Sequence, residues 1–249
     1  MTNTLAALGV LAIAAILLLV LTLMRRRSPG LFRTIGAYNR LNRAVGHAVE
    51  GGTRLHISIG RGNLFTTRGG SALAGLAMLR HLSERTSQSD QPPIVTSGDA
   101  SLAILSQDTL QSGYRAAGAE EQYRFTTGRL AGLTPFAYAA GTIPIIQDEN
   151  VSANIIIGDL GSESALLIEA AERKGDADLI AASDNLSAQS VFYAASQDPL
   201  IGEELFASGA YVGAGAPHQA SLQVQDVLRW LVILAILGGA VLKFLGFSF

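Results

Sequence analysis

The chain has 249 residues, of which 49% are apolar and only 15% are charged, with no cysteine and a formal net charge of −2. Globular domains usually carry about 25% charged residues, and here the apolar excess is concentrated at the two ends of the chain. This composition excludes collagen-like chains, disulfide-bonded scaffolds, zinc–cysteine modules and wholly disordered proteins. It leaves catalysis open, although no complete hydrolase, metalloprotease or kinase motif is present.

The N-terminal segment is predicted to cross a membrane. Residues 4–24 include no charged side chain, and about 20 helical residues cross a hydrocarbon core of ~30 Å. A cleaved secretory signal is the alternative, but it needs basic residues before the apolar stretch and a small-residue cleavage site after it. Here the order is reversed, because Arg25, Arg26 and Arg27 follow the apolar stretch.

The basic residues near this span predict its orientation. Lysine and arginine accumulate on the cytoplasmic side of a span, and here they follow residues 4–24 whereas none precedes them. We therefore expect the N-terminus outside and the body of the chain in the cytoplasm, where the absence of cysteine fits a reducing compartment. The arginines expected at the membrane surface are Arg25, Arg26, Arg27, Arg33, Arg40 and Arg43.

Residues 28–50 are predicted to form a basic amphipathic helix next to the membrane. Ser28 suits its cap, Pro29 suits its first turn, and Gly51 with Gly52 suits its end. We expect this helix to pack on the following domain, with a role at the lipid surface as the alternative. Its apolar residues recur at intervals of three and four, and they are Leu31, Ile35, Tyr38, Leu41, Val45 and Ala48.

Residues 51–225 are predicted to form one cytoplasmic α/β domain. Apolar runs at residues 54–60, 93–96, 153–158 and 178–182 are each followed by a helical pattern. Strands that alternate with helices in this way are typical of a mostly parallel sheet with covering helices, a Rossmann-like architecture. Residues 119–150 fit either strands or buried helices.

Charge is distributed unevenly along the chain. Residues 25–85 hold 11 basic and 2 acidic side chains, whereas residues 90–204 hold 5 basic and 17 acidic ones. Anionic lipid headgroups attract a basic stretch and repel an acidic one. We therefore expect the domain to turn its basic part towards the membrane. The acidic surface argues against nucleic acid as a partner.

The C-terminal segment, residues 229–249, predicts a second span. Arg229 and Trp230 stand at its start as interface anchors do, and Lys243 lies near the far end, where its long side chain can reach outward. A helix that lies in the membrane interface is the alternative. Two spans would place both termini on the outer side.

A glycine-rich loop at residues 60–70 is the first candidate ligand site. It joins a predicted strand to a predicted helix, and its donors suit an anion at the helix N-terminus. It is no dinucleotide fingerprint, because Phe65 stands where a third glycine is needed, and it lacks the Gly-Lys-Ser/Thr of a P-loop. A turn with basic residues facing lipid is the alternative. The candidate ligand residues in this loop are Gly60, Arg61, Gly62, Thr66 and Thr67.

Asp99, Asp159 and Asp184 form the second candidate, because each follows a predicted strand. Ligands bind outside the carboxyl ends of the strands in open α/β sheets, and carboxylate oxygens suit Mg²⁺ with a bound phosphate. Aspartate is also a preferred helix cap, so capping is the alternative role. No metal site is expected from histidine, because the four histidines show no ligand spacing.

The segments 37–63 (AYNRLNRAVGHAVEGGTRLHISIGRGN) and 71–80 (SALAGLAMLR) resemble an uncharacterised family of bacterial membrane proteins that carries a domain-of-unknown-function label. The resemblance extends over most of the central segment and implies a bacterial cytoplasmic membrane. It implies no activity, cofactor or catalytic residue.

Two functional hypotheses follow from the sequence. The first is an accessory or scaffold subunit that associates with the lipid bilayer and with itself or other membrane-associated proteins. The second is a membrane-tethered binding domain or enzyme for a phosphorylated or nucleotide-like ligand at the strand ends. Transport by the spans alone is disfavoured, because neither span contains a polar site.

Overall fold

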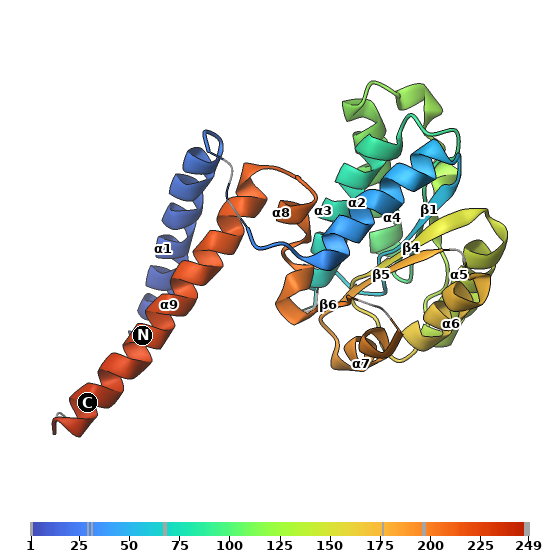
Figure 1. Ribbon diagram of the computed structural model, residues 1–249. Helices are drawn as coiled ribbons and strands as arrows, with labels where there is room; N and C mark the ends of the chain where they lie inside the picture. The colour runs from blue at the N-terminus through green and yellow to red at the C-terminus, as the bar shows by residue number, and fades with distance from the viewer. Residues whose placement is uncertain are drawn as a thin grey trace. The chain divides into compact units, whose positions relative to one another are not determined.

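The computed structural model describes residues 2–28, 30, 32–66, 69–175, 177–195 and 198–246. The chain divides into two compact units. One unit combines Met1–Phe32 with Gly215–Phe249, and the other is Arg33–Ala214. The first unit consists of helices, and the second consists of a sheet with helices (Figure 1).

The first unit consists of helices α1 (Thr2–Arg25) and α9 (Ala216–Phe244). Both are long and apolar enough to cross a membrane, by length and composition. The Arg25 guanidinium donates a hydrogen bond to the side-chain oxygen of Gln223 at 2.8 Å. The C-terminal end of α1 therefore lies beside the N-terminal part of α9.

Helix α9 starts earlier than the predicted span of residues 229–249. Its N-cap, Gly215, has a φ of +117°, and Pro217 lies in its first turn. Proline fits a helix at this place because its missing amide hydrogen has no helical partner there. The helix therefore adds a polar stretch, residues 216–228, before the apolar part, and residues 247–249 lie outside the described residues.

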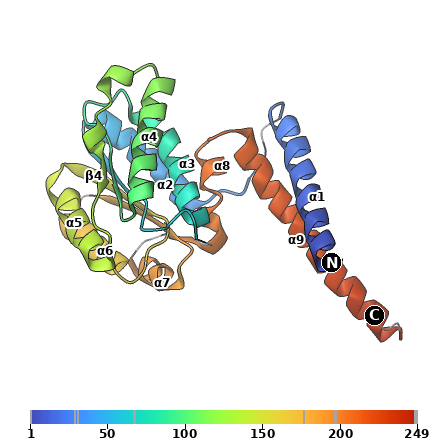
Figure 2. The ribbon, with the colours of Figure 1, turned by 180° about the vertical axis from the view of Figure 1, so that it is seen from behind.

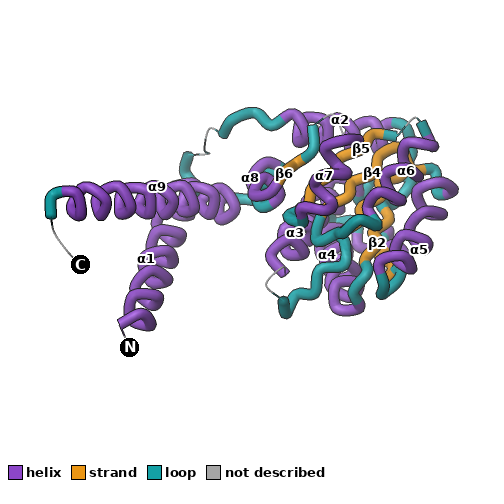
Figure 3. Tube along the Cα trace, turned by 90° about the horizontal axis from the view of Figure 1, so that it is seen from below, coloured by secondary structure: helices purple, strands orange, loops and turns teal. Residues whose placement is uncertain are grey.

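The second unit contains a six-stranded, entirely parallel sheet in the order β3-β2-β1-β4-β5-β6. This confirms the predicted α/β fold class with a parallel sheet, and the strand order is the one found in Rossmann folds. Figure 3 shows the strands in orange between the helices. The strands are β1 (Arg54–Ser58), β2 (Ile94–Ser97), β3 (Gly128–Leu130), β4 (Val151–Ile157), β5 (Asp178–Ser183) and β6 (Leu200–Ile201).

Helices cover both faces of this sheet, because alternate strand residues point to opposite sides. Leu55, Ile57 and Ile155 belong to one buried cluster with α2 (Gly36–Glu50), α3 (Gly69–Thr86) and α4 (Ala100–Ala116). Ile156 and Ala181 belong to the other cluster, with α5 (Pro135–Asp148), α6 (Ser164–Lys174) and α7 (Leu186–Ala195). Figures 1 and 2 show the two groups of helices on opposite sides of the strands.

Residues 119–150, which the sequence left open between strands and buried helices, contain both helical turns and a strand. Two 3₁₀ turns, Glu120–Gln122 and Phe125–Thr127, precede β3, and the buried helix α5 follows it. The Thr134 hydroxyl oxygen accepts a hydrogen bond from the Ala137 amide and caps α5. After β6, a 3₁₀ turn (Gly202–Leu205) and the short helix α8 (Ser208–Tyr211) complete the unit.

The predicted helix at residues 28–50 begins at Gly36 and not at Ser28. Ser28 lies in the turn after α1. Arg33 is kept out of the helix because its carbonyl accepts a hydrogen bond from the Tyr211 hydroxyl at 2.8 Å and its guanidinium pairs with Glu204. Helix α2 is thus a layer of the α/β unit: it packs its apolar side, including Leu41, on the sheet.

Candidate functional site

The strand order places the reversal of the sheet topology between β1 and β4. The chain builds outward from β1 to β3 and then returns to the other side of β1 with β4. In open α/β sheets, ligands bind outside the carboxyl ends of the strands at this point. Of the predicted site residues, Gly60, Arg61 and Gly62 follow β1 and Asp159 follows β4, so these two loops meet at one place.

Two glycines shape this meeting point. Gly60 has a φ of +72° and Gly158 a φ of +123°, and L-residues with side chains rarely adopt such values. A Cβ atom on Gly60 would lie 2.6 Å from the Asp159 carbonyl oxygen, and one on Gly158 would clash with the Ile59 carbonyl. The loops after β1 and β4 therefore touch through their backbones, and a side chain fits at neither glycine.

Backbone hydrogen bonds connect the loops beyond the strand ends. The Arg61 amide donates to the Asp159 carbonyl at 2.9 Å, and the Gly98 amide donates to the Gly60 carbonyl at 2.9 Å. These bonds link the loop after β1 to the loops after both neighbouring strands. In this protein, backbone hydrogen bonds therefore join the loops at the position where Rossmann-type sheets bind their ligands.

The Arg61 side chain lies across the same place. Its Nε atom donates to Oε1 of Glu163 at 2.9 Å, and the Gly161 amide donates to the same oxygen at 2.9 Å. Arg61 also passes close to Gly98, where a Cβ atom would clash with it. An arginine from the loop after β1 thus reaches over the end of β2 and ion-pairs with the segment after β4.

Glu163 is the buried partner of this ion pair, with 3% of its side chain exposed. Burial by itself raises the pKa of a carboxyl group, but the hydrogen bonds from the Gly161 amide and Arg61 outweigh it and lower the pKa of Glu163 below its usual range. Glu163 is therefore ionised at neutral pH. The Glu163 carboxylate thus pairs with the Arg61 guanidinium, which the sequence analysis proposed as a donor to an anionic ligand.

Of the remaining loop candidates, Thr66 has a local partner. The Thr66 hydroxyl donates to the Asn63 carbonyl at 2.8 Å, within its own loop. Gly62 is buried. Thr67 lies outside the described residues.

The three candidate aspartates follow β2, β4 and β5, and they do not share one role. Asp99 caps α4: its carboxylate accepts hydrogen bonds from the Leu102 amide at 3.1 Å and from the Ser101 hydroxyl. Asp159 contributes the carbonyl that binds Arg61, and Asp184 follows β5. Within the described part of the chain, no group of three histidine, aspartate or glutamate residues is placed to hold a metal ion.

A buried polar network that the sequence analysis missed lies between the sheet and α5. His56 Nδ1 is 3.0 Å from Asn154 Oδ1, and His56 Nε2 is 2.9 Å from the Thr96 hydroxyl. The Ser58 and Tyr138 hydroxyls are 2.6 Å apart in the same layer. All five residues are buried from solvent. The sequence does carry a signal for this network: polar and apolar residues alternate along β1, which puts the polar side chains on one face of the sheet. His56, however, was considered only as a metal ligand.

Burial lowers the pKa of His56 to about 4. The imidazole is therefore neutral at pH 7, and its Nδ1–H donates to Asn154 while Nε2 accepts from Thr96. This network crosses from β2 through β1 to β4 and is buried from solvent, so it joins the three strands.

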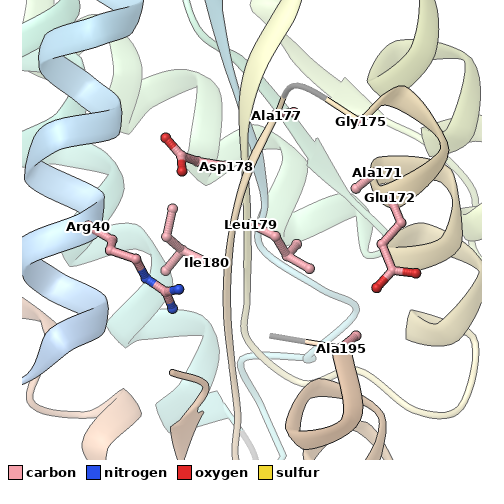
Figure 4. A pocket seen from close by; sticks show the side chains of 9 residues that line it. All are labelled: Arg40, Ala171, Glu172, Gly175, Ala177, Asp178, Leu179, Ile180 and Ala195. Atoms are coloured by element: carbon pink, nitrogen blue, oxygen red, sulfur yellow. The ribbon is translucent and has the colours of Figure 1, made fainter. Parts of the chain in front are cut away.

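One edge of the sheet carries a groove. Strand β6 pairs only with Ala182 and Ser183 of β5, so the first half of β5 has no neighbour on that side among the described residues. A pocket of about 340 Å³ surrounds this half-strand, and we call it the β5 edge groove. Figure 4 shows Arg40, Asp178 and Ile180 on one side of β5 and Leu179 on the other. The full lining is Arg40, Ala171, Glu172, Gly175, Ala177, Asp178, Leu179, Ile180 and Ala195.

Arg40 was predicted at the membrane surface, and the structure places it in this groove. Its side chain is only 16% exposed and lies 3.6 Å from the Asp198 carboxylate. Helix α2 therefore directs this arginine along the sheet edge.

Comparison with known proteins identifies one family. The family model described as "Domain of unknown function (DUF6754)" matches residues 1–249. No curated protein and no solved structure matches the chain.

Acid is expected to destabilise the fold through His56. Its pKa is about 4 in the folded protein and 6.5 in its ordinary state, so the unfolded chain binds a proton first as the pH falls. The stabilisation is complete above pH 6.5 and decreases between pH 6.5 and 4 by about 3 kcal/mol. Thermal unfolding of the whole chain in mild detergent, followed by circular dichroism across this range, measures it. The His56→Gln variant should lose less stability over the same range, and an identical pH profile in both proteins would contradict this role.

Breaking the ion pair at the strand ends is expected to destabilise the protein. Arg61→Ala leaves the Glu163 carboxylate buried without its cation, at a cost of about 2 kcal/mol, less than for a fully buried pair because Arg61 is partly exposed. The double variant Arg61→Ala with Glu163→Gln should recover part of the lost stability. The side-chain oxygen of the glutamine still accepts the hydrogen bond from the Gly161 amide, and no unpaired charge is buried. Thermal unfolding at pH 7 measures both, and a double variant less stable than Arg61→Ala would rule out this explanation.

Proposed function

The chain belongs to the DUF6754 family, whose model covers it from end to end, and we propose that it is a two-span membrane protein whose α/β domain is an accessory or scaffold unit for a partner polypeptide. The observation that carries this proposal is the β5 edge groove, where half of a strand has no neighbour among the described residues. The switch point supports it, since the usual small-molecule position is bridged by the chain's own groups.

The membrane part of the proposal rests on α1 and α9. Both are candidate spans, and the Arg25–Gln223 hydrogen bond puts the end of α1 level with the polar start of α9. The α/β unit is connected at these two ends. Because Arg25, Arg26 and Arg27 stand there, the positive-inside rule favours a cytoplasmic domain with both termini outside, in a bacterial cytoplasmic membrane.

The backbone direction in β5 favours an extended segment in the groove. The Ala182 carbonyl accepts a hydrogen bond from the Gly158 amide, so Ala182 faces β4. Alternate residues of a strand face opposite neighbours, so the amide and carbonyl of Leu179 face the groove. An added strand is the partner that satisfies such groups along a sheet edge.

The groove carries charges of both signs. Arg40, Glu172 and Asp178 line it, and the Arg40 guanidinium lies 3.6 Å from the Asp198 carboxylate. The exposed backbone of β5, and not one sign of charge, is therefore what selects the partner. We propose an extended segment of a membrane-associated protein in this position.

A second function is favoured by the strand order alone. The order with its reversal between β1 and β4 is the one that places phosphorylated or nucleotide-like ligands at the carboxyl ends. Such a ligand would have to displace Glu163 from Arg61. A nucleotide or phosphate ester that stays bound through native purification, and is lost in Arg61→Ala, would favour this function over the scaffold.

The scaffold function predicts a larger particle that depends on the β5 edge. Native mass measurement of the full chain in mild detergent should show a second polypeptide, and Leu179→Pro should release it because proline removes the amide that faces the groove. Leu179→Val keeps this amide and is the matched control. A wild-type particle that contains a single chain, or a complex that Leu179→Pro leaves intact, would contradict the proposal.

The membrane arrangement predicts a labelling pattern, because the chain has no cysteine of its own. In intact cells, a membrane-impermeant maleimide should modify Thr4→Cys near the outer end of α1 but not Gln88→Cys in the domain. Both variants should react after the cells are opened. Labelling of Gln88→Cys in intact cells would reverse the proposed orientation.

A further inference from the structure

The two ends of the sheet differ in their exposed side chains. At the carboxyl ends of the strands, large apolar residues are exposed in the loops and in the first two turns of the helices that follow. Phe65 is 90% exposed, Phe136 is 74% exposed and Leu186 is 79% exposed. We call this set the carboxyl rim, and its members are Phe65, Leu73, Ile104, Leu133, Phe136 and Leu186.

The opposite end of the sheet has polar and charged loops, in which Glu120 pairs with Arg115 and Glu149 pairs with Arg54 and Arg129. Asp90, Glu120, Glu121 and Glu149 belong to the segments that lead into the amino ends of β2, β3 and β4. In the described part of these segments, Phe125 is the exposed large apolar side chain. Because isolated exposed apolar residues are ordinary on a protein surface, it is their accumulation at one end of the sheet that calls for an explanation.

We propose that the carboxyl rim enters the headgroup region of the lipid bilayer. Apolar and aromatic side chains on loops and helix starts gain free energy when they leave water for this region. The polar and charged amino-end loops point the other way along the strands and stay in water. The polarity of the domain along its strands thus matches a domain whose carboxyl end rests on a membrane.

The route of the chain keeps the rim within reach of a membrane. Arg33, the first residue of the domain, pairs with Glu204 just after β6, so the chain enters the domain at the carboxyl end of the sheet. Arg25 ends α1, and the intervening chain spans at most about 28 Å when extended. This step relies on the proposed function in one respect, namely that α1 and α9 are membrane spans.

Single cysteines test the proposal in the cysteine-free chain. Phe136→Cys reports on the rim, and Phe125→Cys is its matched control, because the two phenylalanines are 74% and 73% exposed at opposite ends of the sheet. Each variant carries a nitroxide spin label in full-length protein, reconstituted in vesicles of phosphatidylcholine and phosphatidylglycerol. Collision of the label with oxygen, which concentrates in lipid, is compared with collision with a water-soluble nickel chelate.

We expect the ratio of oxygen to nickel accessibility to be several-fold higher for the Phe136→Cys label than for the Phe125→Cys label. Leu186→Cys should behave like Phe136→Cys, which keeps the test open if one variant folds poorly. Equal nickel accessibility at all three positions would show that the rim is in water and would overturn the proposal. A rim label that is shielded from both reagents would also overturn it, because a protein and not lipid would then cover the rim.

These outcomes are separate from those of the proposed function. The β5 edge groove lies along the side of the sheet and contains no rim residue. Loss of the partner in Leu179→Pro would leave the rim labels unchanged. If α1 does not span the membrane, Thr4→Cys would not be labelled in intact cells, independently of the spin-label ratio.

Discussion

The backbone contact between the loops after β1 and β4 is the constraint on which the rest of the domain depends. The chain reverses its direction of sheet growth between these strands, so their ends must meet. Gly60 and Gly158 allow the two loops to touch, and the Arg61 amide binds the Asp159 carbonyl. Once the loops are this close, the Arg61 side chain finds Glu163 as its partner. The strand order is that of a Rossmann fold, and at its switch point the loops are bridged by the protein's own backbone and by the Arg61–Glu163 pair.

The uneven distribution of charge along the sequence is partly explained by ion pairs within the domain. The basic first part and the acidic second part of the chain fold against each other: the pairs are Arg33–Glu204, Arg40–Asp198, Arg54–Glu149 and Arg61–Glu163. Each pair joins residues far apart in the sequence. These arginines form ion pairs within the domain. Arg25, Arg26 and Arg27 precede the domain, so the proposed membrane orientation depends on these three residues. Part of the charge contrast along the sequence is therefore used in ion pairs within the domain.

Local sequence signals predicted the elements well and their arrangement poorly. The runs before Gly60 and Gly158 form strands because the strands of a covered parallel sheet are rich in apolar residues. Asp99 takes a capping position that its residue type favours. The start of α2 was mispredicted, because the Ser28–Pro29 pattern suits a helix but tertiary contacts of Arg33 hold the preceding segment outside it. Strand order and the short length of β6 depend on pairings that no local pattern encodes. The β5 edge groove follows from those pairings and was out of reach of the sequence, whereas the polar residues of the His56 network alternate with apolar ones along β1 and could have been found.

The two proposed surfaces are compatible because they lie in different directions. Strands of a sheet expose their ends in one direction and the edge strand in another, perpendicular to the first. A domain that rests on its carboxyl rim therefore leaves the β5 edge groove open parallel to the membrane, where the extended segment of a membrane-associated protein is concentrated. The closed switch point fits this arrangement, because a position pressed towards lipid is poorly accessible to a soluble nucleotide. Lipid contact at the strand ends and strand addition at the sheet edge would then be two parts of one anchoring function, with the Arg61–Glu163 pair holding the strand ends together.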